Sequence, residues 1–363
     1  MQYVSKGDLG IVTFGVEGIR LLLEKPTLTQ EKQTEEQSGL RSLTLGAPST
    51  SQPGTGRRMR ALLISMRPRQ WTKNLAVFVG LVFAQQLLNL ASLERAFIAF
   101  VVFCLASSSI YLFNDILDLE NDRQHPMKSK RPLASGALPI SWAIATIGIL
   151  ILGCAGLTLL IFSIPSQQRT DIFASLGGAN VLFASTVAAY LLLMVLYSVR
   201  LKHVVLLDVF IIASGFVLRI LAGAVVIPVM ISPWLYLVTI LLSLFLALSK
   251  RRHELVLLQE EASNHRQILK EYSLPLLDQM ITIVTAATIM AYSLYTFQGP
   301  TGNHRLMITI PLVLYGMFRY LYLIHMRMEG GSPEEVLLRD RHMLGTVVFC
   351  TAAIIIVLYV LPS

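Results

Sequence analysis

Apolar residues in this chain are gathered into nine runs separated by polar segments. Each run approaches the roughly 20 residues that a helix needs to cross the hydrocarbon core of a bilayer. The runs cover residues 75–93, 96–117, 140–164, 177–198, 204–227, 234–249, 276–297, 306–325 and 344–361. The pattern therefore predicts an all-α fold, a polytopic membrane bundle of nine transmembrane helices.

The composition agrees with this prediction. The residues AVILMFWYC make up 54% of the chain and only 14% of it is charged, whereas soluble domains average about 25% charged residues. The three cysteines, Cys104, Cys154 and Cys350, lie inside apolar runs and have no partners at metal-ligand spacing. Neither a disulfide framework nor a zinc site is expected.

The N-terminal segment differs from the rest of the chain. Residues 26–58 are rich in Ser, Thr, Gln, Gly and Pro, and their apolar content is too low to offset the entropy of ordering. No signal peptide is evident, because the weakly apolar stretch 10–23 lacks a basic start and a small-residue cleavage site. We therefore predict a disordered tail over 1–58 and a nine-helix membrane domain over 59–363. Met59 is an alternative start of the chain.

The net charge of +8 follows membrane topology rather than nucleic-acid binding. Loops on one side of the predicted helices carry most of the Lys and Arg, whereas the alternate loops carry only Arg95, Arg169 and Arg305. Positive residues are retained on the cytoplasmic side. We therefore expect a multi-pass protein of the cell inner (plasma) membrane, with a cytoplasmic N-terminus, an external C-terminus and no nucleic-acid partner.

The second predicted helix ends in a cluster of oxygen-bearing side chains. Asn114, Asp118 and Asp122 follow one another at i, i+4 and i+8, so on a helix they share one face, and Asp115 lies beside it. Mg²⁺ typically takes one or two carboxylates and completes its coordination with water and phosphate oxygens. The alternative is an acidic helix end on a solvated loop, but carboxylates at the membrane border are costly unless they are functional. The spacing therefore predicts a Mg²⁺ site, formed by these four residues, for a metal-bound diphosphate.

Basic and polar residues near the same membrane side are candidates for substrate contact, because cations bind the phosphate oxygens that a metal leaves free. After the aspartates come Arg123, Lys128, Lys130 and Arg131. The other loops add Arg69, Lys73 and Asn74, then Tyr197, Arg200, Lys202 and Asp208, then Lys250, Arg251 and Arg252. Arg69 and Lys73, at i and i+4, are expected to point along one helix face toward the aspartates.

Some of these cations have a second interpretation. Arg200, Lys202 and the basic run 250–252 are also explained as residues that fix topology or that face the carbonyl end of a helix. Arg219 falls inside the fifth predicted helix, where a buried arginine requires an anion. Either Asp208 or the substrate would supply it, which makes Arg219 a further candidate for substrate contact.

These residues resemble the UbiA superfamily of membrane prenyltransferases, whose hallmark is N-D-x-x-D-x-x-x-D at the cytoplasmic end of the second of nine helices. In this chain the motif is Asn114, Asp115, Asp118 and Asp122. The resemblance runs from about residue 60 to the C-terminus and also rests on RPRQWTKN, KSKRPLASG, YSVRLKHVVLLDV, GFVLR, LSKRRHEL, RYLYL and SPEEVLLRD. It implies a transferase in which Asp115, Asp118 and Asp122 are catalytic through the metal that they hold.

Within the superfamily, these pieces are most similar to decaprenyl-phosphate phosphoribosyltransferases of bacterial arabinan synthesis. Users of isoprenyl diphosphates generally carry a second motif with two or more aspartates between the fourth and fifth helices, but here Asp208 stands alone. The resemblance implies Mg²⁺-dependent transfer of a 5-phosphoribosyl group from phosphoribosyl diphosphate to a polyprenyl phosphate, a step of cell wall biosynthesis. The alternative is prenyl transfer to an aromatic or other small acceptor. Lipid chain length and oligomeric state have no signature in the sequence.

Overall fold

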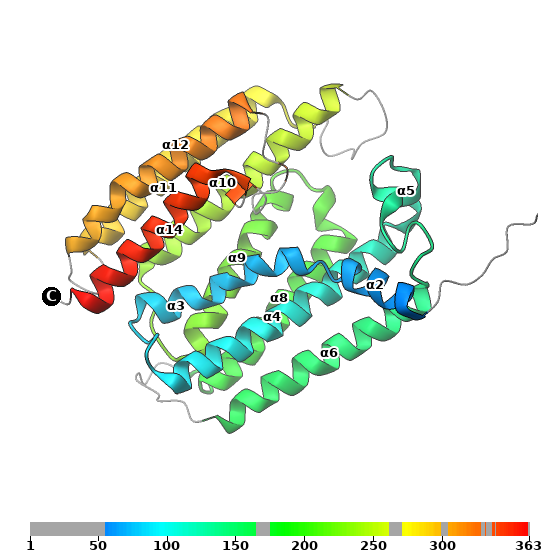
Figure 1. The fold of residues 1–363 in the computed structure, drawn as a ribbon, viewed down its shortest axis with the longest axis horizontal. Helices are drawn as coiled ribbons and strands as arrows, with labels where there is room; N and C mark the ends of the chain where they lie inside the picture. Colours follow the sequence, from blue (N-terminus) through cyan, green and yellow to red (C-terminus); the bar gives the residue numbers. More distant parts are fainter. Residues whose placement is uncertain are drawn as a thin grey trace, which may run out of the picture. The chain divides into compact units, whose positions relative to one another are not determined.

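The computed structural model describes residues 55–164, 175–260, 271–298, 304–327, 331, 336–337 and 339–361, with the side chains of 258–260 left aside. Within these ranges the chain is helical and contains no strand, which confirms the all-α prediction (Figure 1). Eight of the described helices are long and apolar enough to cross a membrane. They are α4 (Leu90–Leu117), α6 (Ile140–Ser163), α8 (Ala179–Val199), α9 (Leu207–Val226), α10 (Pro233–Glu260), α11 (Leu274–Gln298), α12 (Ile310–Met326) preceded by η6 (His304–Thr309), and α14 (Arg341–Ile355) continued by the π-helix η7 (Ile356–Val360).

The first predicted helix, 75–93, is wrong in its boundaries. That stretch belongs to a 3₁₀-helix, η2 (Pro68–Val77), and a short α-helix, α3 (Phe78–Phe83), and α4 already begins at Leu90 behind the N-cap Asn89. The turn between α3 and α4 covers residues 84–89 and contains Gln85, Gln86 and Asn89, so the predicted apolar run continued across a polar break. A 3₁₀-helix rises about 2.0 Å per residue, so the 10 residues of η2 and the 6 of α3 extend about 29 Å. That length is close to the hydrocarbon thickness of about 30 Å, but η2 carries Arg69 and Lys73, and neither short helix is among the eight candidate spans of the described residues.

The helix α9 packs tightly on η2 and α3. A Cβ added to Gly223 would lie 1.9 Å from the carbonyl oxygen of Val77, and one added to Gly80 would lie 3.1 Å from Ala224 Cα. The two backbones therefore touch where only glycine fits. This contact fixes η2 and α3 beside α9 in the core formed by residues such as Leu81 and Phe103.

A further helix, α2 (Thr55–Ser65), precedes η2. Its residue Ala61 is buried against Leu112 of α4 and Leu138, next to α6. The helix begins at Thr55, four residues before the predicted start of the membrane domain, so the boundary at 58/59 falls inside α2. Residues 1–54, which make up most of the predicted tail, lie outside the described residues.

Consecutive helices run in opposite directions, so the C-terminal ends of α4, α8, α10 and α12 meet the N-terminal ends of α6, α9, α11 and α14. We call this the Asp-motif end, because α4 carries Asn114 and Asp115 there and Asp118 and Asp122 follow it. The other end of the helices is called the opposite end.

Candidate functional site

The Asp motif, Asn114, Asp115, Asp118 and Asp122, spans the break between α4 and α5 (Leu119–Gln124). The α4 helix ends at Leu117, but the helical hydrogen bonds continue through the break from Asp118 N to Asn114 O at 2.9 Å and from Asp122 N to Asp118 O at 2.8 Å. The i, i+4, i+8 spacing therefore survives. Asp115 and Asp122 are almost fully buried, at 2% and 3% exposed.

Two arginines hold the buried carboxylates of this motif. Arg131 Nη1 lies 3.2 Å from Asp115 Oδ1 and 2.6 Å from Asp122 Oδ2. Arg67 Nη2 contacts the same Asp115 oxygen at 2.5 Å, and its guanidinium stacks over the ring of Tyr111. Oxygens of two aspartates thus converge on a single cationic nitrogen, as they would have to do around a metal ion.

The third aspartate has a lysine partner from another loop. Lys202 Nζ in η4 (Leu201–His203) lies 2.6 Å from Asp118 Oδ1, while Asn114 Nδ2 donates to Asp118 Oδ2 at 2.9 Å. The amide oxygen of Asn114 thus stays available as a further hard ligand. Among the described residues no three His, Cys, Asp or Glu side chains are already gathered as a metal cage. The donor atoms nevertheless fit Mg²⁺, which needs few protein oxygens when phosphate supplies the rest.

Asp208 belongs to a second, fully buried ion pair. Its Oδ2 lies 2.6 Å from Arg251 Nε, with exposed fractions of 0% and 1% for the two side chains. The N–H is not aimed at that oxygen, so the contact is an ion pair without a hydrogen bond. The other carboxylate oxygen accepts a hydrogen bond from Tyr272 at 2.8 Å. Asp208 is therefore neutralised inside the protein.

Arg219 does not pair with Asp208. Its Nε donates to Asn74 Oδ1 at 2.7 Å, its Nη1 to the Gly215 carbonyl at 2.7 Å, and its Nη2 to the Tyr190 hydroxyl at 2.8 Å. The guanidinium also stacks on the ring of Tyr190. These partners are all neutral, so of the two anions considered from the sequence, the protein carboxylate is excluded.

The remaining candidates lie in three different environments. Arg252 contacts Asp278 of α11 at 2.6 Å, and Arg251 also contacts Glu254 and Tyr197, so both arginines join helices at the Asp-motif end. Arg123 is exposed and pairs with Glu120, away from the motif. Exposed positions are also occupied by Arg69, Lys130 and Arg200, whereas Lys128 and Lys250 are partly buried.

The expected shared face of Arg69 and Lys73 is wrong. These residues lie on η2, and in a 3₁₀-helix with three residues per turn the neighbours on one face are i and i+3. Lys73 accordingly contacts Gln70, while Asn74 turns inward and is fully buried.

Sequence reasoning missed Arg67 and Tyr272. Arg67 precedes Pro68 in RPRQWTKN and adopts a left-handed backbone with φ of 54°, which sends its side chain to Asp115. Its position before a proline was the available signal, since that residue is sterically restricted. Tyr272 had no signal, because it reaches Asp208 across 64 residues of sequence.

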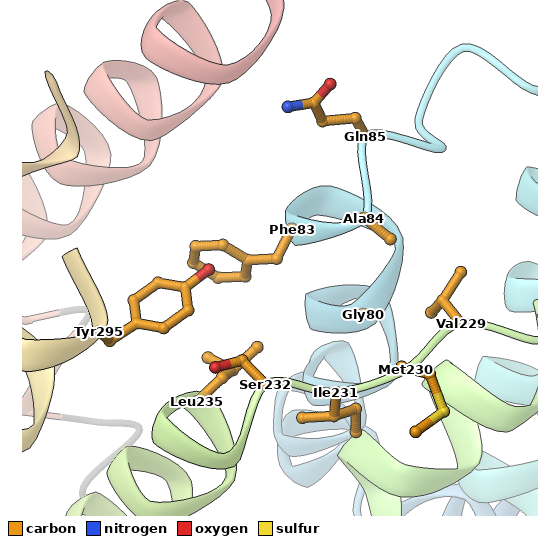
Figure 2. Close-up of a pocket in the computed structure, with 10 residues that line it drawn as sticks. All are labelled: Gly80, Phe83, Ala84, Gln85, Val229, Met230, Ile231, Ser232, Leu235 and Tyr295. Carbon is orange, nitrogen blue, oxygen red and sulfur yellow. The ribbon is translucent and has the colours of Figure 1, made fainter. Parts of the chain in front are cut away.

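A cavity of about 270 Å³ lies at the opposite end, between α3, the α9–α10 connection and α11 (Figure 2). Phe83, Ile231 and Leu235 form its apolar walls, and Tyr295 projects its ring beside Phe83. No ionisable side chain apart from that phenol lines it. The cavity therefore does not serve the charged chemistry of the Asp motif.

Comparison with known proteins agrees with this arrangement. The family model described as the UbiA prenyltransferase family matches residues 74–333. A decaprenyl-phosphate phosphoribosyltransferase from Corynebacterium glutamicum is 31% identical over 308 residues, covering 83% of this chain and 87% of the relative. One from Mycolicibacterium smegmatis is 34% identical over 297 residues, covering 77% and 86%.

Solved structures share the fold at low sequence identity. A UbiA homolog from Archaeoglobus fulgidus bound to GPP and Mg²⁺ superposes with a TM-score of 0.61 at 16% identity, covering 81% of this chain and 99% of the homolog. A digeranylgeranylglyceryl phosphate synthase superposes with a TM-score of 0.54 at 20% identity, covering 82% and 99%.

Proposed function

Because the chain belongs to the UbiA prenyltransferase family and is a multi-pass membrane transferase, we propose that it transfers a 5-phosphoribosyl group from phosphoribosyl diphosphate to a polyprenyl phosphate, releasing diphosphate. Relatives at 31% and 34% identity are named decaprenyl-phosphate phosphoribosyltransferases. The proposed reaction takes place at the cytoplasmic membrane face, where the Lys and Arg pattern puts the Asp-motif end.

The burial of Asp208 is the observation that carries this choice. A family member that uses an isoprenyl diphosphate is expected to present a second group of aspartates, but here the single acid of that loop is 0% exposed and neutralised by Arg251. One acidic centre is left, surrounded by Arg67, Arg131 and Lys202. One metal-bound diphosphate and a separately bound phosphate monoester match that balance of charges.

The Asp motif is the proposed metal site. Asp115, Asp118 and Asp122, with the Asn114 amide oxygen, would hold Mg²⁺, which supplies charge neutralisation to the departing diphosphate. Arg67, Arg131 and Lys202 would exchange part of their contact with the carboxylates for phosphate oxygens. The acceptor phosphate oxygen is already anionic when it attacks the ribose carbon, so the chain needs no strong general base.

Prenyl transfer to an aromatic or other small acceptor is the second candidate. It is favoured by the bound GPP and Mg²⁺ of the superposed Archaeoglobus fulgidus homolog. It predicts consumption of an isoprenyl diphosphate, so the two candidate reactions use different donors.

The deciding experiment offers the purified protein two labelled substrate pairs in detergent with Mg²⁺. We expect phosphoribosyl diphosphate and polyprenyl phosphate to yield a labelled lipid and diphosphate, and geranyl diphosphate with an aromatic acid to yield nothing. Prenylation of the aromatic acid without consumption of phosphoribosyl diphosphate would reverse the proposal.

The proposed orientation has its own test at the two ends of α6. Single cysteines replace Gly136 or Ser163 in a background without the three native cysteines. An impermeant thiol reagent added outside the cell should label the cysteine at 163 and spare the cysteine at 136. The reverse pattern would invert the topology.

A further inference from the structure

A strained turn lies between the Asp motif and the buried Asp208. Leu206, the residue before α9, has φ of 65° and ψ of −41°. A leucine in the left-handed half of the backbone map is an outlier that persists only where its surroundings hold it. Four residues earlier, Lys202 contacts Asp118 at 2.6 Å. Any contact that fixes Leu206 therefore also fixes the segment that carries Lys202.

The hydroxyl of Tyr272 holds this turn from both sides. It accepts a hydrogen bond from Leu206 N at 2.7 Å and donates one to Asp208 Oδ1 at 2.8 Å. The ring is only 5% exposed and packs in the core with Val209 and Leu277, so the hydroxyl is rigidly placed. Burial raises the pKa of Tyr272 to about 12, so the hydroxyl keeps its proton throughout the neutral range.

The turn is connected to the motif by a short, hydrogen-bonded segment. His203 N bonds to Arg200 O at 3.2 Å within η4, and Asp208 N bonds to Val204 O at 3.1 Å. Lys202 is only 6% exposed. The segment between Lys202 and Leu206 is short and held by these hydrogen bonds. A change in the backbone conformation of Leu206 would therefore weaken the contact between Lys202 and Asp118.

We propose that Tyr272 is a positioning residue that holds Lys202 on the Asp motif through the strained Leu206 turn. Tyr272 stands at the entrance of α11, more than sixty residues from the loop that it fixes. Its hydroxyl is engaged by Leu206 N and Asp208 Oδ1, so it acts through the loop rather than on a substrate. The consequence for catalysis rests on the proposed function, whereas the placement of Lys202 does not.

The test measures the accessibility of Lys202 without any substrate. Tyr272→Phe removes the hydroxyl and keeps the buried ring. Purified wild type and variant are acetylated with an amine reagent, and the rate at each lysine is read by mass spectrometry, with exposed Lys130 as internal reference. Loss of two hydrogen bonds to a strained turn should raise acetylation of Lys202 about tenfold and leave Lys130 unchanged.

Tyr292→Phe is the matched control. Its hydroxyl contacts Thr309 at 2.6 Å, is buried, and lies at the opposite end. It should leave Lys202 protected. If both variants raised the acetylation rate of Lys202 equally, the cause would be a general loosening of the protein, and the proposal would be overturned. An acetylation rate of Lys202 in Tyr272→Phe equal to that of the wild type would overturn it as well.

Leu206→Gly provides the rescue, because glycine adopts positive φ without strain. Added to Tyr272→Phe, it should restore at least half of the protection of Lys202, and failure to restore any would contradict the role of strain. In turnover assays Tyr272→Phe should raise KM for the diphosphate donor and keep kcat. Exposure of Lys202 in a protein that consumes no phosphoribosyl diphosphate would refute the proposed reaction while leaving the positioning role intact.

Discussion

Arg131 and Arg95 show how differently the two ends of the helices use arginine side chains. Arg131, at the Asp-motif end, pairs with two carboxylates and keeps 28% of its side chain exposed. Arg95, at the opposite end, is 1% exposed and donates only to neutral oxygens. Those acceptors are the carbonyls of Val226, Ile161 and Ile164 and the Asn180 side chain.

The difference distinguishes a candidate binding site from a contact that only stabilises the fold. Arg95 joins the carbonyl ends of α6 and α9, whose partial negative charge favours a cation, and three of its four acceptors are main-chain carbonyls of these ends. The arginines at the Asp-motif end are bound to carboxylates, whose partners can be exchanged for a metal ion or a phosphate. Under the proposed function, Arg67 and Arg131 at the Asp-motif end take part in binding the donor, whereas Arg95 at the opposite end is committed to the fold.

The largest expected effect is on turnover at the Asp-motif end. Asp118→Ala or Asp122→Ala removes a proposed metal ligand and the carboxylate that pairs with Lys202 or with Arg131, which keeps only Asp115 in the second case. The rate of product formation should fall by roughly 10³-fold, while circular dichroism and membrane insertion stay unchanged. Activity near that of the wild type would remove the motif from the mechanism.

The opposite end should respond in stability instead. Arg95→Met removes the donor to the carbonyls of Val226 and Ile164 and to the Asn180 side chain, while Ile161 O keeps Ile164 N, so the free energy of unfolding should fall by about 3 kcal/mol. Thermal unfolding in detergent measures it, and Arg123→Met, which breaks only an exposed pair with Glu120, is the control with little expected change. KM for the donor, measured in the folded fraction, should not move. A changed KM with normal stability would break the distinction between the two ends.

The sequence located most of the fold and part of the site. Eight candidate spans follow from apolar length, whereas the predicted run 75–93 has the wrong boundaries because hydropathy does not distinguish a 3₁₀-helix from an α-helix. The Asp motif was visible because its members are neighbours along one helix. The partner of Arg219 was not visible, because Asn74 lies 145 residues away in the sequence. Asp208 is nearer in the sequence but does not contact Arg219. Long-range pairing depends on packing, which spacing does not encode.

Lys202 gives a smaller effect at the Asp-motif end. Lys202→Ala deletes a charge-assisted contact, so the apparent affinity for the diphosphate donor should fall by roughly one to two orders of magnitude. Steady-state kinetics over donor concentration measure it. Arg327→Ala removes an exposed cation at the C-terminal end of α12, at the same Asp-motif end, and should change little. Equal losses in both variants would indicate a general effect of charge rather than a specific contact.

The smallest expected effect concerns a pair that joins α12 to α14. Arg319 holds Asp340 at 2.7 Å and lowers the pKa of that carboxyl through their hydrogen bond. A lowered pKa in the folded state contributes stability above the ordinary pKa of an aspartate and loses it as pH falls through the folded value. The stability difference between wild type and Arg319→Met should therefore be present at pH 7 and shrink in acid. A difference that grows in acid would contradict this assignment.

Metal binding tests the central contrast most directly. Mn²⁺, a paramagnetic stand-in for Mg²⁺ at oxygen sites, is titrated by electron paramagnetic resonance into the purified protein with diphosphate present. Wild type and Arg95→Met should bind it alike, and Asp118→Ala combined with Asp122→Ala should bind it at least about tenfold more weakly. Unchanged Mn²⁺ affinity in the double aspartate variant would contradict the account.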